Sequence, residues 1–300
     1  MLFRSQLAVL QDARLSGLYL PGCRAAQGLD LQGARFAGSV HLCDGFHASG
    51  EVNLVGACIT GQLGCDGGRF DGAGGLALNC NGVTVGADVF LRGGFYASGE
   101  VNLGGASITR QLGCGGGRFD GAGGLALNCD GVTVGAGVFL SGGFHASGEV
   151  NLVGASITGQ LACNGGRFDG AGGLALSCNG MTVGADVFLR GGFHASGLVD
   201  FTRARITGNL RVQQAQLAGG IDLEQARVEA ALVWEAVSGV QGQGPWRPDD
   251  PARWPLVPGS LPLVDLTEAR LGSLRDQPGA GARCRNCGWG GWSMTGWGRG

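Results

Sequence analysis

The sequence predicts an all-β fold, a quadrilateral β-solenoid, and three features of the chain carry this prediction. A nine-residue phrase that begins at Phe46 recurs in steps of 49 residues, at Phe95, at Phe144 and, in weaker form, at Phe193. Glycine accounts for 63 of the 300 residues, a density that destabilises helices. Apolar residues come in i, i+2 pairs such as Val52 and Leu54, which is the spacing of a short strand with one buried face.

Each 49-residue unit divides into two turns of the solenoid. The turns begin 22 to 25 residues apart, at Leu31, Leu54, Leu78, Leu103, Leu127, Leu152, Leu176, Phe201 and Leu223. Glycine or polar corners separate four short apolar pairs in each turn, so each turn has four sides. Aligning the two halves of a unit places Ile59 beside Val83 and Phe70 beside Phe95. Nine or ten turns, stacked at the ~4.8 Å distance between strands, give a rod roughly 45 Å long.

The chain divides into five segments. Residues 1–28 are expected to form an N-terminal cap and a first partial turn, with a short helix over residues 1–14 that covers the open strand edges. The solenoid occupies residues 29–237. Residues 238–262 contain six of the eight prolines and are expected to be a loop insertion, after which residues 263–276 form one last turn. Residues 277–300 have low complexity and are expected to be a disordered tail.

Several segments resemble the pattern A-(D/N)-L-x-x of the pentapeptide-repeat proteins: Ala13–Leu15, Leu29–Leu31, Val199–Leu210 and Ile221–Leu223. The longer phrase G-E-V-N-L-x-G-A-x-I-T-G-Q-L is similar to a group of bacterial pentapeptide-like β-helix proteins, some of which are called "membrane-associated oxidoreductase". The resemblance covers about Leu29 to Leu274. It implies a right-handed quadrilateral β-helix and no established activity. The turns of this chain are longer than the 20 residues of the strict pentapeptide pattern.

The charge balance argues against nucleic-acid partners. The net charge is −2, only 15% of the residues are charged, and the 21 basic residues are all arginine. A protein that binds nucleic acid by neutralising phosphates needs a basic excess, which is missing here. With 23 acidic residues, the chain also departs from the dense acidic surface of the gyrase-binding pentapeptide proteins that mimic DNA.

The terminal sequence and the cysteines indicate a cytoplasmic location, with a peripheral membrane location left open. The N-terminus has no sustained apolar segment, so we expect no signal peptide. The longest uncharged run, Gly131–Gly148, contains six glycines and is not expected to be a transmembrane segment. Eleven cysteines in a chain without a signal sequence favour reduced thiols.

Six cysteines recur at 49-residue steps in two sets: Cys65, Cys114 and Cys163, and Cys80, Cys129 and Cys178. Each stands at i+2 from a leucine, so we expect the thiols to point into the core. Equivalent residues lie two turns apart, about 9.6 Å, which is too far for a disulfide or a shared metal ion. Cys284 and Cys287 form a single C-x-x-C without further ligands. No metal and no cofactor are therefore expected.

Two further sets of residues recur once per turn and are candidate surface columns. The first follows an inward apolar residue and is expected to face solvent: Thr60, Thr84, Thr109, Thr133, Thr158, Thr182 and Thr207. The second follows the inward phenylalanine: His47, Asp71, Tyr96, Asp120, His145, Asp169 and His194.

Each column has two interpretations. A flat threonine face resembles ice-binding β-solenoids, but threonine also stacks well on any exposed strand. Alternating His and Asp can form a pH-sensitive ladder. They can equally be exposed residues that avoid like-charge stacking, the interpretation we favour because no nucleophile or ligand set joins them.

The sequence contains no motif for dinucleotide, phosphate-loop, zinc-protease or serine-hydrolase chemistry, and we expect no catalytic residues. We therefore expect a non-enzymatic rigid scaffold that binds a protein partner, with end-to-end self-association as a further possibility. Three alternatives remain open: an oxidoreductase, as the name used in the similar group suggests, a gyrase-binding DNA mimic, and an ice-binding protein. An enzyme of this kind would need a site built from residues 238–262.

Overall fold

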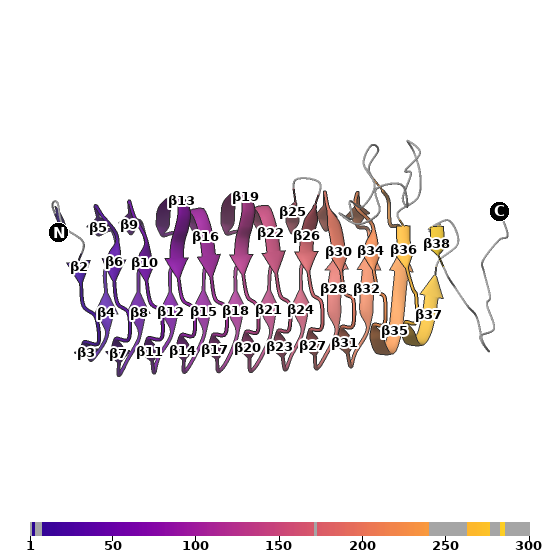
Figure 1. Cartoon of the computed structure of the whole chain (residues 1–300), viewed down its shortest axis with the longest axis horizontal. Coiled ribbons are helices and arrows are strands. Elements are labelled where there is room, and N and C mark those ends of the chain that lie inside the picture. Colours follow the sequence, from indigo (N-terminus) through magenta and orange to yellow (C-terminus); the bar gives the residue numbers. More distant parts are fainter. Residues whose placement is uncertain (1, 4–7, 171–172, 240–262, 277–282, 286–300) are drawn as a thin grey trace.

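The computed structural model describes residues 2–3, 8–170, 173–239, 263–276 and 283–285. These residues form a parallel β-solenoid of about ten turns, which is the fold class that the sequence predicts. The turns follow one another along a single rod, with the N-terminus at one end and β36 to β38 at the other (Figure 1). Among the described residues, none belongs to a helix.

Two sheets, both parallel, make up the solenoid. The first contains β1 (Leu2–Phe3), β2 (Ala8–Val9), β5 (Arg24–Ala25), β6 (Leu29–Asp30), β9 (His47–Ala48), β10 (Val52–Asn53), β13 (Arg69–Asn79), β16 (Tyr96–Asn102), β19 (Arg118–Asn128), β22 (His145–Asn151), β25 (Arg167–Asp169), β26 (Leu174–Ser177), β29 (His194–Ala195), β30 (Leu198–Asp200), β33 (Gln216–Leu217), β34 (Ile221–Asp222), β36 (Leu263–Asp265) and β38 (Arg283–Arg285). The second contains β3 (Arg14–Leu15), β4 (Leu18–Tyr19), β7 (Arg35–Phe36), β8 (Val40–His41), β11 (Cys58–Ile59), β12 (Leu63–Gly64), β14 (Thr84–Val85), β15 (Val89–Phe90), β17 (Ser107–Ile108), β18 (Leu112–Gly113), β20 (Thr133–Val134), β21 (Val138–Phe139), β23 (Ser156–Ile157), β24 (Leu161–Ala162), β27 (Thr182–Val183), β28 (Val187–Arg190), β31 (Arg205–Ile206), β32 (Leu210–Gln213), β35 (Arg227–Glu235) and β37 (Arg270–Asp276).

One turn consists of four short strands, as β9 to β12 illustrate. In each strand one side chain enters the core and its neighbour faces outward, because successive side chains of a strand point to opposite faces. Val52 and Ile59 are fully buried, whereas Asn53 and Cys58 are partly exposed. The four-sided turn predicted from the i, i+2 pairs is therefore present.

The turns differ in length more than the sequence suggests. The register pairs Val52 with Leu78 and Leu78 with Val101, so that turns of 26 and 23 residues alternate. The additional residues are concentrated in β13, where the register shifts between Asp71 and Leu76 around Gly74, which has a φ of +84°. The expected alignment of Ile59 with Val83 is consequently wrong. Ile59 pairs with Val85.

Asparagine and aspartate close the corner that follows the β10-type strand in almost every turn. The side-chain Oδ1 of Asn53 accepts a hydrogen bond from the Val55 amide at 3.0 Å, and Oδ1 of Asp200 accepts one from the Thr202 amide at 2.7 Å. These side chains mimic a backbone turn two residues further along the chain. This explains why Asp or Asn recurs between two inward apolar residues.

Phenylalanine rings form one continuous stack through the core. Consecutive ring centroids lie 5.1 to 5.5 Å apart in the series Phe46, Phe70, Phe95, Phe119, Phe144, Phe168 and Phe193, and each ring is at most 1% exposed. The backbone positions of successive phenylalanines differ, because Phe70 pairs in register with Ala97 and not with Phe95. Its ring nevertheless stacks on Phe95. A Cβ at Gly68 would lie 2.8 Å from the Phe70 ring and 2.6 Å from the Leu42 carbonyl oxygen, so this position requires glycine.

The six periodic cysteines belong to the core, as predicted. All six have an exposed fraction of zero, and Cys65 lies between Leu42 and Leu91 of the adjacent turns. Burial raises the pKa of all six thiols, that of Cys129 to about 12. The thiols are therefore protonated at neutral pH. The nine cysteines between Cys23 and Cys178 are all free.

The ends of the rod differ from the sequence-based expectations. β1 and β2 already pair with β5 and β6, so residues 8–14 continue the solenoid where a capping helix was expected. At the other end, β36 and β37 lie within the expected last turn, and β38 pairs with β36. Part of the expected tail, residues 283–285 with Cys284, is thus a strand. Most of the expected insertion, residues 240–262, and the rest of the tail lie outside the described residues.

The described part of the chain contains no helix that could span a membrane.

We expect Phe119→Ala to lower the free energy of unfolding in urea by about 3–5 kcal/mol, because it opens a cavity in the middle of the stack. The matched control is Phe139→Ala, which removes a half-buried, outward-facing ring and is expected to cost about 1 kcal/mol. Equal losses in the two variants would contradict the central role of the stack.

We further expect the six buried cysteines to resist alkylation by iodoacetamide in the native protein, because they are inaccessible and protonated. Cys23 and Cys58, which are partly exposed, provide the internal control and should react. Peptide mass spectrometry measures the modified fraction at each position. Rapid labelling of Cys114 without unfolding would refute the packing described above.

Candidate functional site

The outward side chains of the solenoid form columns, because every turn pairs in parallel register with the next. One column runs along the second sheet and changes character along the rod. It begins with Arg14 and Arg35 and continues through Cys58, Thr84, Ser107, Thr133, Ser156 and Thr182 to Arg205, Arg227 and Arg270. We call the five residues Thr84, Ser107, Thr133, Ser156 and Thr182 the hydroxyl column. All five are exposed.

The seven threonines predicted as one column belong to two. Thr84, Thr133 and Thr182 are in the hydroxyl column, where Ser107 and Ser156 lie between them. The other four threonines lie in a second column, one inward residue further along each strand: Thr60, Thr109, Thr158 and Thr207. In that column they alternate with Gly86, Gly135 and Gly184. A Cβ at these glycines would collide with the threonine carbonyl oxygen of the preceding turn. All seven threonines are exposed, as expected, but the shift of register in β13 separates them.

The predicted His/Asp column also divides in two. His47, Tyr96, His145 and His194 share one column with Arg69, Arg118 and Arg167. Asp71, Asp120 and Asp169 occupy a neighbouring column and pair in register with Ser98 and Ser147. The structure therefore places cationic and aromatic side chains beside carboxylates, in place of a strict alternation of His and Asp.

Side chains from the two columns still meet. The Nε2 atom of His145 lies 3.0 Å from Oδ2 of Asp169, and Arg167 Nε donates to the same oxygen at 2.7 Å. His194 Nε2 lies 3.9 Å from the other oxygen, Oδ1. Burial by itself would raise the pKa of Asp169, but the hydrogen bonds from Arg167 and His145 outweigh it and lower the pKa below its ordinary value.

The same arrangement recurs two turns earlier around Asp71. His47 Nε2 and Arg69 Nε each lie 2.9 Å from Asp71 Oδ2, and the Arg69 guanidinium stacks 4.6 Å from the centre of the Tyr96 ring. Here too the hydrogen bonds from His47 and Arg69 outweigh burial and lower the carboxyl pKa. In the described part of the chain, no set of three or more His, Cys, Asp or Glu side chains could hold a metal ion. In each cluster an Arg–Asp ion pair lies within one strand, and a His–Asp contact joins adjacent turns.

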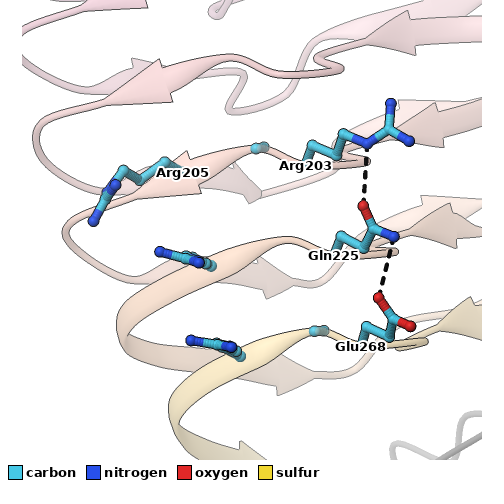
Figure 2. Close-up of a pocket in the computed structure, with 8 residues that line it drawn as sticks. Arg203, Arg205, Gln225 and Glu268 are labelled. Atoms are coloured by element: carbon cyan, nitrogen blue, oxygen red, sulfur yellow. Dashed lines mark hydrogen bonds between the residues drawn. The ribbon is translucent and has the colours of Figure 1, made fainter.

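A groove of about 710 Å³ lies near the C-terminal end of the rod, and the sequence reasoning missed it. Its walls carry Arg203, Arg205, Arg227, Arg270, Gln225 and Glu268, and Ala204 and Ala269 also line it. We call it the arginine groove. Arg203 Nε donates a hydrogen bond to Gln225 Oε1, and Gln225 Nε2 donates to Glu268 Oε2, each at 3.1 Å (Figure 2). The groove thus presents a hydrogen-bonded corner column beside a column of three arginines.

The corner column of the groove departs from the glycine that the middle turns place there, as Asp12 of the first turn, with a φ of +51°, also does. Seven successive turns place glycine with a φ near +60° at this corner: Gly33, Gly56, Gly82, Gly105, Gly131, Gly154 and Gly180. Arg203, Gln225 and Glu268 occupy the same corner with φ values of +57°, +57° and +54°. A side chain in this conformation costs about 1–2 kcal/mol per residue. The signal in the sequence is the replacement of glycine by long polar residues at three consecutive corners.

The arginine column carries a second cost. Arg205, Arg227 and Arg270 pair in register, so their backbones are one strand spacing apart. Two unit charges ~4.8 Å apart repel each other by about 0.9 kcal/mol in water and about 3.5 kcal/mol at the effective dielectric constant near a protein surface. Glu229 offsets one charge, since its Oε1 lies 3.3 Å from Arg205 Nε.

No protein-family profile, curated protein sequence or solved structure matches this chain. Its function must therefore be argued from its own residues.

We expect Asp169→Asn to lower the free energy of unfolding at pH 7 by about 0.5–1 kcal/mol, the range of partly exposed ion pairs. The native pKa of Asp169 is lowered, so its contribution is complete above the unfolded-state pKa of about 3.9 and disappears as the pH falls through the native pKa. The difference between the two proteins should thus vanish at strongly acidic pH. Asp130→Asn, at an exposed corner, is the control and should show no such pH dependence.

Proposed function

We propose that the protein is a non-enzymatic rigid scaffold that binds a protein partner through its hydroxyl column and the glycine corners beside it. The observation that supports this proposal is the uniform parallel register, which repeats the same outward residue types at a ~4.8 Å spacing over five turns. A surface of this kind offers a long row of equivalent contacts. A catalytic site, by contrast, needs several different groups that converge on one point.

The hydroxyl column is suited to binding because it is flat and uncharged. Its members are small, and the adjoining corners are Gly82, Gly105, Gly131, Gly154 and Gly180. Five turns extend over about 19 Å along the axis. Arg205 borders the face directly at one end, and Arg35 follows Cys58 at the other end. They limit the flat face to the middle turns.

Two further proposals concern relationship and location. We propose that the chain is related to the pentapeptide-repeat proteins, and the Asp or Asn at the corner of each turn supports this, because its side chain closes the turn there. We propose a cytoplasmic location, which the nine free cysteines between Cys23 and Cys178 support, since buried thiols persist in a reducing compartment.

The test compares capture of a host protein by the immobilised full chain and by two arginine variants. Thr133→Arg places a charge in the middle of the hydroxyl column and is expected to reduce capture at least tenfold. Ser141→Arg is the matched control, because it introduces on another side of the turn the residue found at the equivalent positions Arg92 and Arg190. Capture that both variants abolish, or that neither changes, would contradict the proposal.

The same proteins distinguish the alternatives. Thermal hysteresis that Thr133→Arg removes would favour ice binding over a protein partner. A flavin or nicotinamide absorbance in the purified protein would favour an oxidoreductase, and inhibition of gyrase supercoiling would favour DNA mimicry. Each of these results would replace the scaffold proposal.

A further inference from the structure

We propose that the arginine groove binds a small molecule that carries two or three adjacent phosphate groups. This site adjoins the hydroxyl column at Arg205 but contains none of the five residues of that column. The inference therefore does not depend on the scaffold proposal.

The first argument is the alignment of the donors. Arg205, Arg227 and Arg270 start from three consecutive strands, β31, β35 and β37, in direct register. Their backbones extend over about 10 Å along the rod. Arg203 lines the groove from the adjacent corner column, where its Nε donates to Gln225 Oε1 and its guanidinium points away from that of Arg205 (Figure 2). A linear ligand with several acidic groups can contact these side chains in sequence.

The second argument is the unused hydrogen-bonding capacity. Within the described residues, the side chains of Arg227 and Arg270 have no hydrogen-bond or ion-pair partner, whereas Arg205 is paired with Glu229. Each guanidinium has five N–H donors. Aligned like charges without counter-charges destabilise the fold unless an anion joins them. A bound polyanion would supply that counter-charge.

The third argument concerns the type of anion. The three guanidiniums of the column belong to residues in direct register, and Figure 2 shows the guanidinium of Arg203 pointing away from that of Arg205. A phosphate group has oxygens in several directions, so a chain of phosphates can accept from successive guanidiniums of this row, while a carboxylate accepts in one plane. The alanines Ala204 and Ala269 leave space between the columns, and a volume of about 710 Å³ suits a small ligand.

The length of the groove favours a small ligand over a polymer. Within the described residues the arginine column covers three turns, and the preceding turn has Thr182 in the same position. The chain as a whole has a net charge of −2. A nucleic acid would need more phosphate contacts than three turns provide.

The experiment is isothermal titration calorimetry of the full chain at low ionic strength with orthophosphate, pyrophosphate and tripolyphosphate. We expect the affinity to rise with each added phosphate, and tripolyphosphate to bind at least tenfold more tightly than orthophosphate. Arg227→Gln and Arg270→Gln should each weaken tripolyphosphate binding about tenfold. Glu268→Gln removes a negative charge from the groove wall and should strengthen it about threefold.

The matched control is Arg35→Gln, which removes one arginine from the same column at the opposite end of the rod and should leave the affinity unchanged. Circular dichroism confirms that each variant is folded. A loss of affinity in Arg35→Gln equal to that in Arg227→Gln would overturn the site, as would weaker binding by Glu268→Gln. Tighter binding of propane-1,2,3-tricarboxylate would overturn the assignment to phosphate. Binding of a DNA oligonucleotide but not of tripolyphosphate would overturn the assignment to a small ligand.

Discussion

Backbone hydrogen bonds between successive turns determine the spacing of every side chain in this molecule. The amide of Leu63 donates to the Asp88 carbonyl at 3.0 Å, and the amide of Cys65 donates to the Phe90 carbonyl at 2.8 Å. The same pattern joins each turn to the next along the rod. Because the strands are parallel, a residue type that recurs in the sequence recurs in space about 4.8 Å further along. Inward residues therefore become stacks, and outward residues become columns.

This constraint also explains how the core tolerates turns of unequal length. The ladder fixes the backbone at the sides of each turn, and the additional residues of the longer turns are absorbed in β13 and its equivalents. Phe70 stands two residues further along its strand than Phe95, yet the ring centroids are 5.2 Å apart. The glycine at position 68 leaves room for this displacement. Stacking of the rings thus survives a shift in backbone register.

Outward-facing residues on such a rod cost the least folding free energy where their side chains are small. Seven turns have glycine at the positive-φ corner, and five of these have Ser or Thr in the neighbouring column. The arginine groove differs at both positions. Its corners have strained backbones at Arg203, Gln225 and Glu268, and its column aligns three like charges. Local rules are commonly broken at functional positions, where another interaction compensates for the cost. This contrast distinguishes the groove from the middle turns of the rod.

The sequence by itself determined the fold class, the four-sided turn and the buried position of the six periodic cysteines, because a strand's alternation and a repeat's period are properties of the local chain. It did not determine which outward residues are neighbours. Thr60 and Thr84 resemble each other in sequence context, but a bulge of a few residues in β13 puts them in different columns. Asp71 and His47 likewise occupy different registers and still form a hydrogen bond. Neighbours across turns depend on where the additional residues are accommodated, and the packing of adjacent turns decides that. The arginine groove follows from the same cause, since Arg205, Arg227 and Arg270 become one site only when the ladder aligns three turns, one of them 43 residues further along the chain.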